Sequence, residues 1–292
     1  MDLRETLTSG RILLADGGMG TELAKVKPVS LQGNLSANCT HPLDVARIHL
    51  HYIRAGSRAI TTNTFLLNAL TPAQERQQVD LDRMNKTGVA LARNMARSDH
   101  FVLGGMGPTG RLFGLDECMT DEAVRAAYLA QAKSLTSSGD VDGLIIETMT
   151  SLREALLALE ACKEVTDKPV IASMTFYTMN RDIRTMNGES AAECAQKLAE
   201  RGADAVGTNC STFLMHQMAE VVARMRAVTS LPIIAQPNAG QPHGEEGTYI
   251  MTPQEFAEGV KLCIDAGATV VGGCCGAGPE CIGEVAKRIK HH

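Results

Sequence analysis

The sequence predicts an α/β fold, and within that class a (β/α)8 TIM barrel. Eight short apolar runs recur along the chain, and segments with helical apolar spacing lie between them. Strict alternation of strand and helix implies parallel strands. The length of 292 residues suits one such barrel, which usually needs about 250 residues. We therefore expect a single domain over residues 1–292, with a doubly wound open sheet as the structural alternative.

The expected strands follow in order at 11–18, 58–65, 100–107, 142–149, 168–176, 203–210, 231–238 and 268–275. Helical spacing is clearest in "EAVRAAYLAQAKSL" and "PQEFAEGVKLCIDA". In "IRAGSRAITTN", "AERGADAVGTN" and "IDAGATVVGG" a helix ends at glycine and a strand begins. Glycine there fits the left-handed residue that closes a helix. The connection 19–41 is unusually long, and long loops in compact domains are often functional.

Composition narrows the class of protein. The hydrophobic fraction is 44%, the charged fraction 21% and the net charge −5, without a block of basic residues. Nucleic acid is therefore not an expected partner. No apolar stretch approaches the roughly 18–20 residues that span a bilayer, so we expect no membrane insertion. The opening "MDLRETLTSG" is polar and acidic, unlike a signal peptide, and we expect the chain to be cytoplasmic.

The nine cysteines are odd in number and irregularly spaced, so we expect no full disulfide framework. Three of them fall where expected strands end: Cys210 after the sixth run, and Cys274 with Cys275 after the eighth. Parallel barrels gather the C-terminal strand ends at one mouth. Three converging thiolates are soft ligands that favour zinc and leave one tetrahedral position open, as in catalytic sites. The alternative is that all three are small buried hydrophobic side chains.

Two carboxylates, Asp16 and Glu147, also end expected strands. They are either structural, for example at helix N-termini, or they hold the ammonium group of an amino-acid substrate. Gly17 and Gly18 belong to "DGGMG", which lacks the third glycine of a dinucleotide fingerprint. The exposed amides of such a loop nevertheless suit a carboxylate.

At these residues the chain resembles the homocysteine S-methyltransferase family. The motifs "DGGMGTEL", "TTNTF", "GPTG", "IIETM", "NCS", "AQPNAGQP" and "VGGCCG" occur in the family's order over nearly the full length. The most specific signal is "NC" followed about 60 residues later by "GGCCG". Within the family, the chain is most similar to the homocysteine-binding module of cobalamin-dependent methionine synthase.

The resemblance implies Zn²⁺ held by the three cysteines and methyl transfer to homocysteine, giving methionine. It implies that Asp16, Glu147 and the amides near Gly17 and Gly18 hold the homocysteine backbone. In relatives the asparagine of "PNAG", here Asn238, can occupy the open zinc position until the thiol displaces it. The segments "LSANCTHP" and "GAGPEC" depart from the family's usual pattern, which affects substrate detail and not the expected ligands.

The methyl donor follows less directly from the resemblance. Family members use methyl-corrinoids, methylated sulfonium compounds or betaine, and the betaine enzymes enclose the quaternary ammonium in aromatic rings. This chain has no Trp and four Tyr, and it carries Leu66 and Thr148 where those enzymes place tyrosines. The chain ends soon after the eighth run, at "GEVAKRIKHH". We therefore expect methylcobalamin on a separate corrinoid protein as the donor, with S-methylmethionine as the alternative.

Two other classes of function remain open at this point. One is a non-catalytic homocysteine-binding or zinc-binding module within a complex. The other is a barrel lyase or aldolase with structural cysteines. Such an enzyme would require a Schiff-base lysine at a strand end. None of the eight runs ends in lysine.

Overall fold

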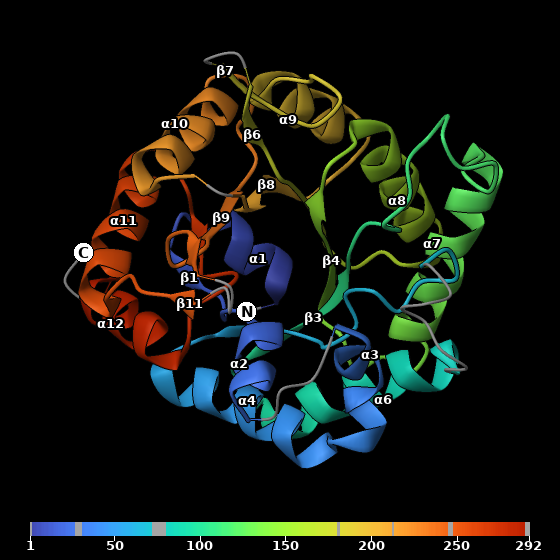
Figure 1. Cartoon of the computed structure of the whole chain (residues 1–292), viewed down its shortest axis with the longest axis horizontal. Helices are drawn as coiled ribbons and strands as arrows, with labels where there is room; N and C mark the ends of the chain where they lie inside the picture. Colours follow the sequence, from blue (N-terminus) through green and yellow to red (C-terminus); the bar gives the residue numbers. More distant parts are fainter. Residues whose placement is uncertain are drawn as a thin grey trace.

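The computed structural model describes residues 2–26, 31–71, 80–179, 182–211, 213–244 and 248–289. Eight parallel strands form one sheet in the order β1-β12-β9-β8-β5-β4-β3-β2. They are β1 (Leu13–Leu14), β2 (Ala59–Thr61), β3 (Phe101–Met106), β4 (Gly143–Met149), β5 (Val170–Met174), β8 (Ala205–Cys210), β9 (Ile233–Pro237) and β12 (Val270–Val271). A parallel bridge between Ala15 and Ala59 joins the first strand to the second. The TIM-barrel prediction is confirmed, and the open sheet is excluded (Figure 1).

Helices surround the barrel (Figure 1). The outer helices are α4 (Pro42–Ala55), α6 (Leu81–Met95), α7 (Asp121–Thr136), α8 (Leu152–Val165), α9 (Ala191–Glu200), α10 (Met215–Arg226), α11 (Pro253–Asp265) and α12 (Pro279–Ile289). The long connection after β1 contains α2 (Met19–Val26) and α3 (Leu31–Thr40). Across the described residues, no helix combines the length and apolar character that crossing a membrane requires.

The strand sequences divide their apolar side chains between two layers. Ile145, Ile171 and Ile234 belong to a buried cluster inside the barrel, while neighbouring strand residues pack in the larger cluster with the helices. This division follows from the alternation of side chains along a strand. The three expected helix-ending glycines have left-handed backbones, with φ of 117° at Gly56, 85° at Gly202 and 110° at Gly267.

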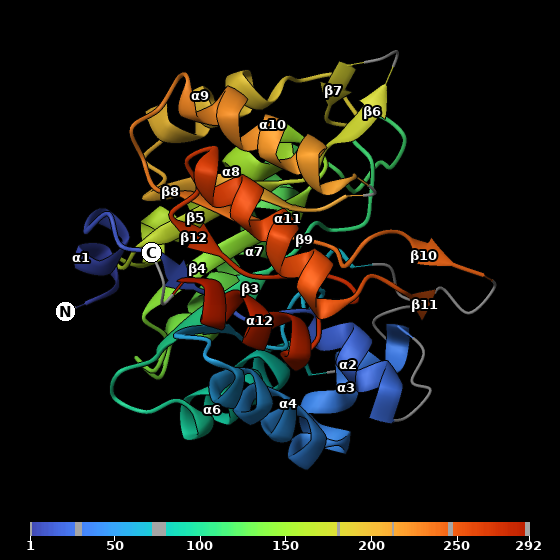
Figure 2. The same cartoon turned by 90° about the vertical axis from the view of Figure 1, so that its left-hand side faces the viewer.

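The two ends of the barrel differ in what covers them. Helix α1 (Leu3–Thr8) lies at one end, and two antiparallel hairpins project toward the other (Figure 2). The hairpins are β6–β7 (Tyr177–Met179 and Asp182–Arg184) and β10–β11 (Pro242–His243 and Thr248–Tyr249). Each hairpin follows a barrel strand, so both belong to the mouth formed by the C-terminal strand ends.

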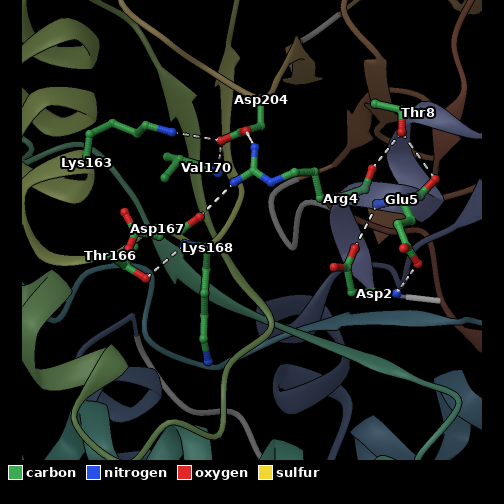
Figure 3. A network of polar contacts seen from close by, with 10 residues as sticks. All are labelled: Asp2, Arg4, Glu5, Thr8, Lys163, Thr166, Asp167, Lys168, Val170 and Asp204. Atoms are coloured by element: carbon green, nitrogen blue, oxygen red, sulfur yellow. Dashed lines mark hydrogen bonds and ion pairs between the residues drawn. The ribbon is translucent and has the colours of Figure 1, made fainter.

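An ion-pair network ties α1 to the N-terminal end of the barrel (Figure 3). Arg4 pairs with Asp204 and donates a hydrogen bond of 2.7 Å to the carbonyl of Asp167. Asp204 also pairs with Lys163 at 3.1 Å and accepts the Val170 amide at 2.8 Å. The carboxylate therefore fixes a strand end and two cations at once, which is a structural role.

Candidate metal centre and active site

A cavity of about 300 Å³ opens at the C-terminal ends of the strands. Residues from β1, β2, β4, β8, β9 and β12, or directly after them, contribute to its wall. Three predicted groups meet there: the carboxylates Asp16 and Glu147, the glycines after Asp16, and the three cysteines. The barrel topology accounts for this convergence, because residues far apart in sequence end neighbouring strands.

The sulfur atoms of Cys210, Cys274 and Cys275 lie within 4.8 Å of one another. Cys210 ends β8 in the left-handed region, with φ of 60°. The adjacent pair follows β12 in a turn that includes Gly276, with φ of 77°. This turn lets neighbouring residues face one point, which a regular strand would not allow. Among the described residues, no other group of three metal-binding side chains is this close.

The three thiols share hydrogen bonds and cannot all ionise at low cost without a cation. Hydrogen bonds from Cys210 and Cys274 lower the pKa of Cys275 to about 3. Hydrogen bonds with Cys210 and Cys275, and then burial, raise the pKa of Cys274 well above its ordinary value. The contact with Cys274 lowers the pKa of Cys210, but the bond to Cys275 and burial outweigh it and raise that pKa to about 11. Without a cation, this cluster favours a single thiolate. A divalent cation would stabilise all three thiolates, so the cluster fits a site for such an ion.

Asn238 holds the two cysteine-bearing turns together. Its Nδ2 donates to the Ser211 carbonyl at 2.6 Å, and its Oδ1 accepts the Cys275 amide at 3.0 Å. The Cys274 amide donates to the Pro237 carbonyl at 2.8 Å. In this structure the Asn238 oxygen is thus engaged by the backbone of the cysteine pair, and its expected place at an open metal position stays a prediction.

The two carboxylates lie in a part of the cavity that favours their neutral forms. Asp16 is 3% exposed and accepts the Thr61 amide at 2.8 Å. Burial raises the pKa of Asp16 to about 7, against the opposing effect of that hydrogen bond. Burial, and then the charges of Asp16 and Cys275, raise the pKa of Glu147 to about 8. The described residues of the cavity wall include no lysine, arginine or histidine, so a cationic ligand would meet no positively charged side chain there.

The glycine pair is required by close packing. A Cβ on Gly17 would lie 2.1 Å from the Ala277 carbonyl oxygen, and one on Gly18 2.6 Å from that of Cys274. The Gly18 amide donates to the Ala277 carbonyl at 3.2 Å, so it already has an acceptor. The following residues begin α2 and line the cavity. The first amides of a helix lack acceptors within it, which places free donors beside the glycine pair.

Asn209 is a residue whose role the sequence did not reveal, although it stands beside Cys210 in "NCS". Its fully buried side chain accepts the Thr148 amide at 2.8 Å and the Ser173 hydroxyl at 2.7 Å. Its Nδ2 donates to the Thr148 hydroxyl at 2.7 Å. Thr148 has φ of 61°, where the β4–β5 register shifts. Asn209 therefore fixes the irregular strand end that carries Glu147.

Two tyrosines also lie near the cysteines, and sequence reasoning missed both. Burial raises the pKa of Tyr249 in β11, and the nearby Cys275 raises it further. Burial raises the pKa of Tyr177 in β6, and the nearby Cys210 raises it further. Both tyrosines come from hairpins that follow the barrel strands, so no strand-end pattern could have found them.

Comparisons with solved structures agree with this architecture. The homocysteine methyltransferase MmuM from Escherichia coli, in its metallated form, superposes with a TM-score of 0.76 at 22% identity, covering 95% of this chain and 96% of that one. The carboxyl transferase domain of Rhizobium etli pyruvate carboxylase, with 3-bromopyruvate, gives 0.56 at 15% identity, covering 99% and 47%. At these identities the likeness shows the fold.

Sequence relatives show more. The chain is 32% identical over 310 residues to methionine synthase of Mycobacterium tuberculosis and 30% identical over 308 residues to that of Mycobacterium leprae. Each alignment covers 99% of this chain and 25% of the relative, so the chain spans about a quarter of their length. The family model described as homocysteine S-methyltransferase matches residues 13–289. The chain therefore belongs to the homocysteine S-methyltransferase family.

Proposed function

We propose that this barrel is a zinc-dependent methyltransferase that methylates the sulfur of homocysteine to give methionine. The observation that carries the proposal is the convergence of three thiols and two buried carboxylates in one cavity without a basic residue in its described wall. Family membership supports the reaction class. The relatives named methionine synthase and the metallated MmuM structure support the substrate and a metal.

Cys210, Cys274 and Cys275 are the residues that would hold zinc. Their sulfurs are the soft donor set that zinc prefers, and their spacing fits a single ion. Bound zinc would supply a site where the substrate thiol loses its proton near neutral pH and remains nucleophilic as a thiolate. Asn238 keeps the two turns in register, so that the three sulfurs face one point.

Glu147 and Asp16 would hold the substrate ammonium. Burial raises the pKa of Asp16 to about 7, and burial together with the charges of Asp16 and Cys275 raises the pKa of Glu147 to about 8. A bound ammonium opposes these shifts, since an opposite charge stabilises the ionised carboxylate. The substrate carboxylate would face the first turn of α2, where backbone amides and the positive end of the helix dipole favour an anion.

We assign the methyl donor to a methylcobalamin-loaded corrinoid protein. Of ten large apolar side chains that are strongly exposed among the described residues, eight come from segments that follow strands at the mouth. They are Val26, Leu43, Leu112, Leu115, Met179, Met186, Leu214 and Ile250. Apolar side chains exposed around the mouth favour a protein partner there, and a cavity of about 300 Å³ is too small to enclose a corrinoid.

The deciding experiment incubates zinc-loaded protein and homocysteine separately with methylcobalamin, S-methylmethionine or betaine, and follows methionine. Methylcobalamin, free or bound to a corrinoid protein, should be the productive donor. Turnover with S-methylmethionine alone would establish the sulfonium alternative, and methionine from betaine alone would overturn the donor assignment. Homocysteine and zinc binding with no turnover from any donor would indicate a non-catalytic module.

A further inference from the structure

The side chain of Gln236, near the end of β9, carries a buried acceptor that is unpaired. Gln236 is 4% exposed, and its Oε1 atom accepts no hydrogen bond from any residue that the structure describes. Buried polar groups nearly always have a partner, because an unpaired one keeps the full cost of its desolvation. Violations of this rule in native proteins are expected at functional sites.

The unpaired oxygen belongs to a side chain of the cavity wall. Of the described residues that have a buried side-chain atom without a hydrogen-bond partner, Gln236 alone lines the cavity. The alternation along β9 accounts for its direction, because Ile234 belongs to the cluster inside the barrel and Ala235 to the outer cluster. Gln236 therefore shares the inner face of the strand with Ile234.

The neighbouring strands explain why the fold itself does not pair this oxygen. Asn209 is the Cα partner of Gln236 on β8, but its amide already bonds groups of β4 and β5. On the other side, the β12 register places Gly272 opposite Gln236. A Cβ on Gly272 would lie 2.6 Å from the Asp16 carbonyl oxygen. Close packing therefore keeps this position free of any side chain that could donate to Gln236.

A primary ammonium group has the donors that this part of the cavity lacks. It carries three N–H groups, and Asp16 and Glu147 in the same cavity wall can accept two of them. The Oε1 atom of Gln236 can accept the third. As a neutral amide, Gln236 adds this acceptor without placing another negative charge beside two carboxylates and three thiols.

We propose that Gln236 is the third acceptor for the substrate ammonium group, and that it makes the cavity selective for thiols that carry a primary amine. A site built to hydrogen-bond a substrate group rejects the analogue that lacks it, because the buried partner then stays unpaired. This inference rests on the proposed function, because it names a further residue that recognises the same substrate.

The test uses Gln236→Met, which replaces the amide by an apolar side chain of similar length. Calorimetric titration of zinc-loaded parent and variant measures the affinities for homocysteine and for its desamino analogue. Gln236→Met should weaken homocysteine binding by about 10-fold, as expected for a lost hydrogen bond to a charged group, and should change the affinity for the analogue by less than about twofold. Gln236→Glu keeps a carbonyl acceptor at this position and should retain homocysteine affinity within about threefold.

A matched control removes the same amide from the outside of the barrel. Gln196 is exposed on α9, so Gln196→Met should bind both ligands as the parent does. Unchanged homocysteine affinity in Gln236→Met would overturn the inference. Equal weakening of both ligands would also overturn it, because the amide would then act on the carboxylate or thiol that the two ligands share.

A second measurement needs no ligand. Because an unpaired buried amide lowers stability, Gln236→Met should raise the midpoint of thermal unfolding of the metal-free protein by about 2 °C, and Gln196→Met should not raise it. A lower midpoint in Gln236→Met would contradict the inference, because it would show that the amide has a partner within the fold.

These readouts separate the inference from the proposed function. Homocysteine binding that depends on Gln236, with no methionine formed from any donor, would refute the proposed function alone. Methionine formation with homocysteine binding that does not depend on Gln236 would refute the inference alone.

Discussion

The two ends of the barrel treat buried acidic groups in opposite ways. At the N-terminal end, Asp204 is matched by Arg4 and Lys163 and also accepts a strand amide. At the mouth, Asp16 and Glu147 lie beside three thiols, and no basic residue belongs to the described cavity wall. In the first arrangement the carboxylate is paired with cations, and it stabilises the fold. The second lacks positive charge, and a metal ion and a substrate ammonium would supply it.

The largest effect should come from the cysteines at the mouth. We expect Cys210→Ala, Cys274→Ala and Cys275→Ala each to abolish methyl transfer and weaken zinc binding, because two sulfurs do not make a tetrahedral zinc site with one open position. Metal analysis and the methionine assay measure both. Cys118→Ala, at an exposed cysteine, is the control and should behave like the parent. Normal activity in any of the three site variants would refute the assignment.

A substitution of the Glu147 carboxylate should have a smaller effect. Glu147→Gln should weaken homocysteine binding by about 10- to 100-fold, the range for a lost charged hydrogen bond, with zinc binding preserved. The desamino analogue of homocysteine should bind poorly to the parent and be nearly indifferent to the substitution. Calorimetric titration of both ligands into both proteins measures this. If the parent and the variant discriminate equally between the ligands, Glu147 is structural.

The Glu147 carboxylate should also lower the free energy of unfolding of the metal-free protein. An unfolded glutamate ionises near its ordinary value of 4.5, but in the folded chain the pKa of Glu147 is about 8. Between these pH values the folded state binds more protons, so Glu147 makes the free energy of unfolding fall as pH rises. At pH 8 we expect Glu147→Gln to be more stable than the parent by about 1–3 kcal/mol.

Urea denaturation of the metal-free proteins at pH 8 and near pH 5 checks this prediction. The difference should be much smaller at the lower pH, because pH 5 lies only just above the ordinary value of 4.5 at which the unfolded carboxyl begins to release its proton, while the folded carboxyl is still neutral. A stability difference that is the same at both pH values would mean that the effect comes from packing and not from ionisation.

A substitution at the N-terminal end of the barrel should change the stability of the protein and not its binding properties. Asp204→Ala leaves the Val170 amide without its acceptor and Arg4 and Lys163 without their shared partner. We expect the free energy of unfolding to fall by about 1–3 kcal/mol, with zinc content and homocysteine affinity unchanged. A change in either binding property would show that the two ends are coupled.

Most of the barrel could be predicted from the sequence because its signals are local. Each expected strand contains an observed one, and Gly56, Gly202 and Gly267 end helices as their junctions indicated. The convergence of the strand-end residues followed from topology. The connection after β1 was expected to be a long loop, yet it contains α2 and α3.

The contacts between elements could not be predicted in the same way. Asn209 accepts the amide of Thr148, which is 61 residues away, and Asn238 accepts the amide of Cys275, which is 37 residues away. Tyr249 lies beside the turn of the cysteine pair on a hairpin whose position cannot be predicted from hydrophobic periodicity. Such groups leave no pattern in a single sequence, because their roles depend on which loops meet above the barrel.

X-ray absorption on the zinc-loaded protein tests the central claim most directly. We predict one zinc per chain, with three sulfur ligands in the absence of homocysteine and four in its presence. The Cys274→Ala, Cys275→Ala double variant should bind no stoichiometric zinc. Full zinc occupancy in that variant, or an unchanged sulfur count when homocysteine is added, would contradict the account.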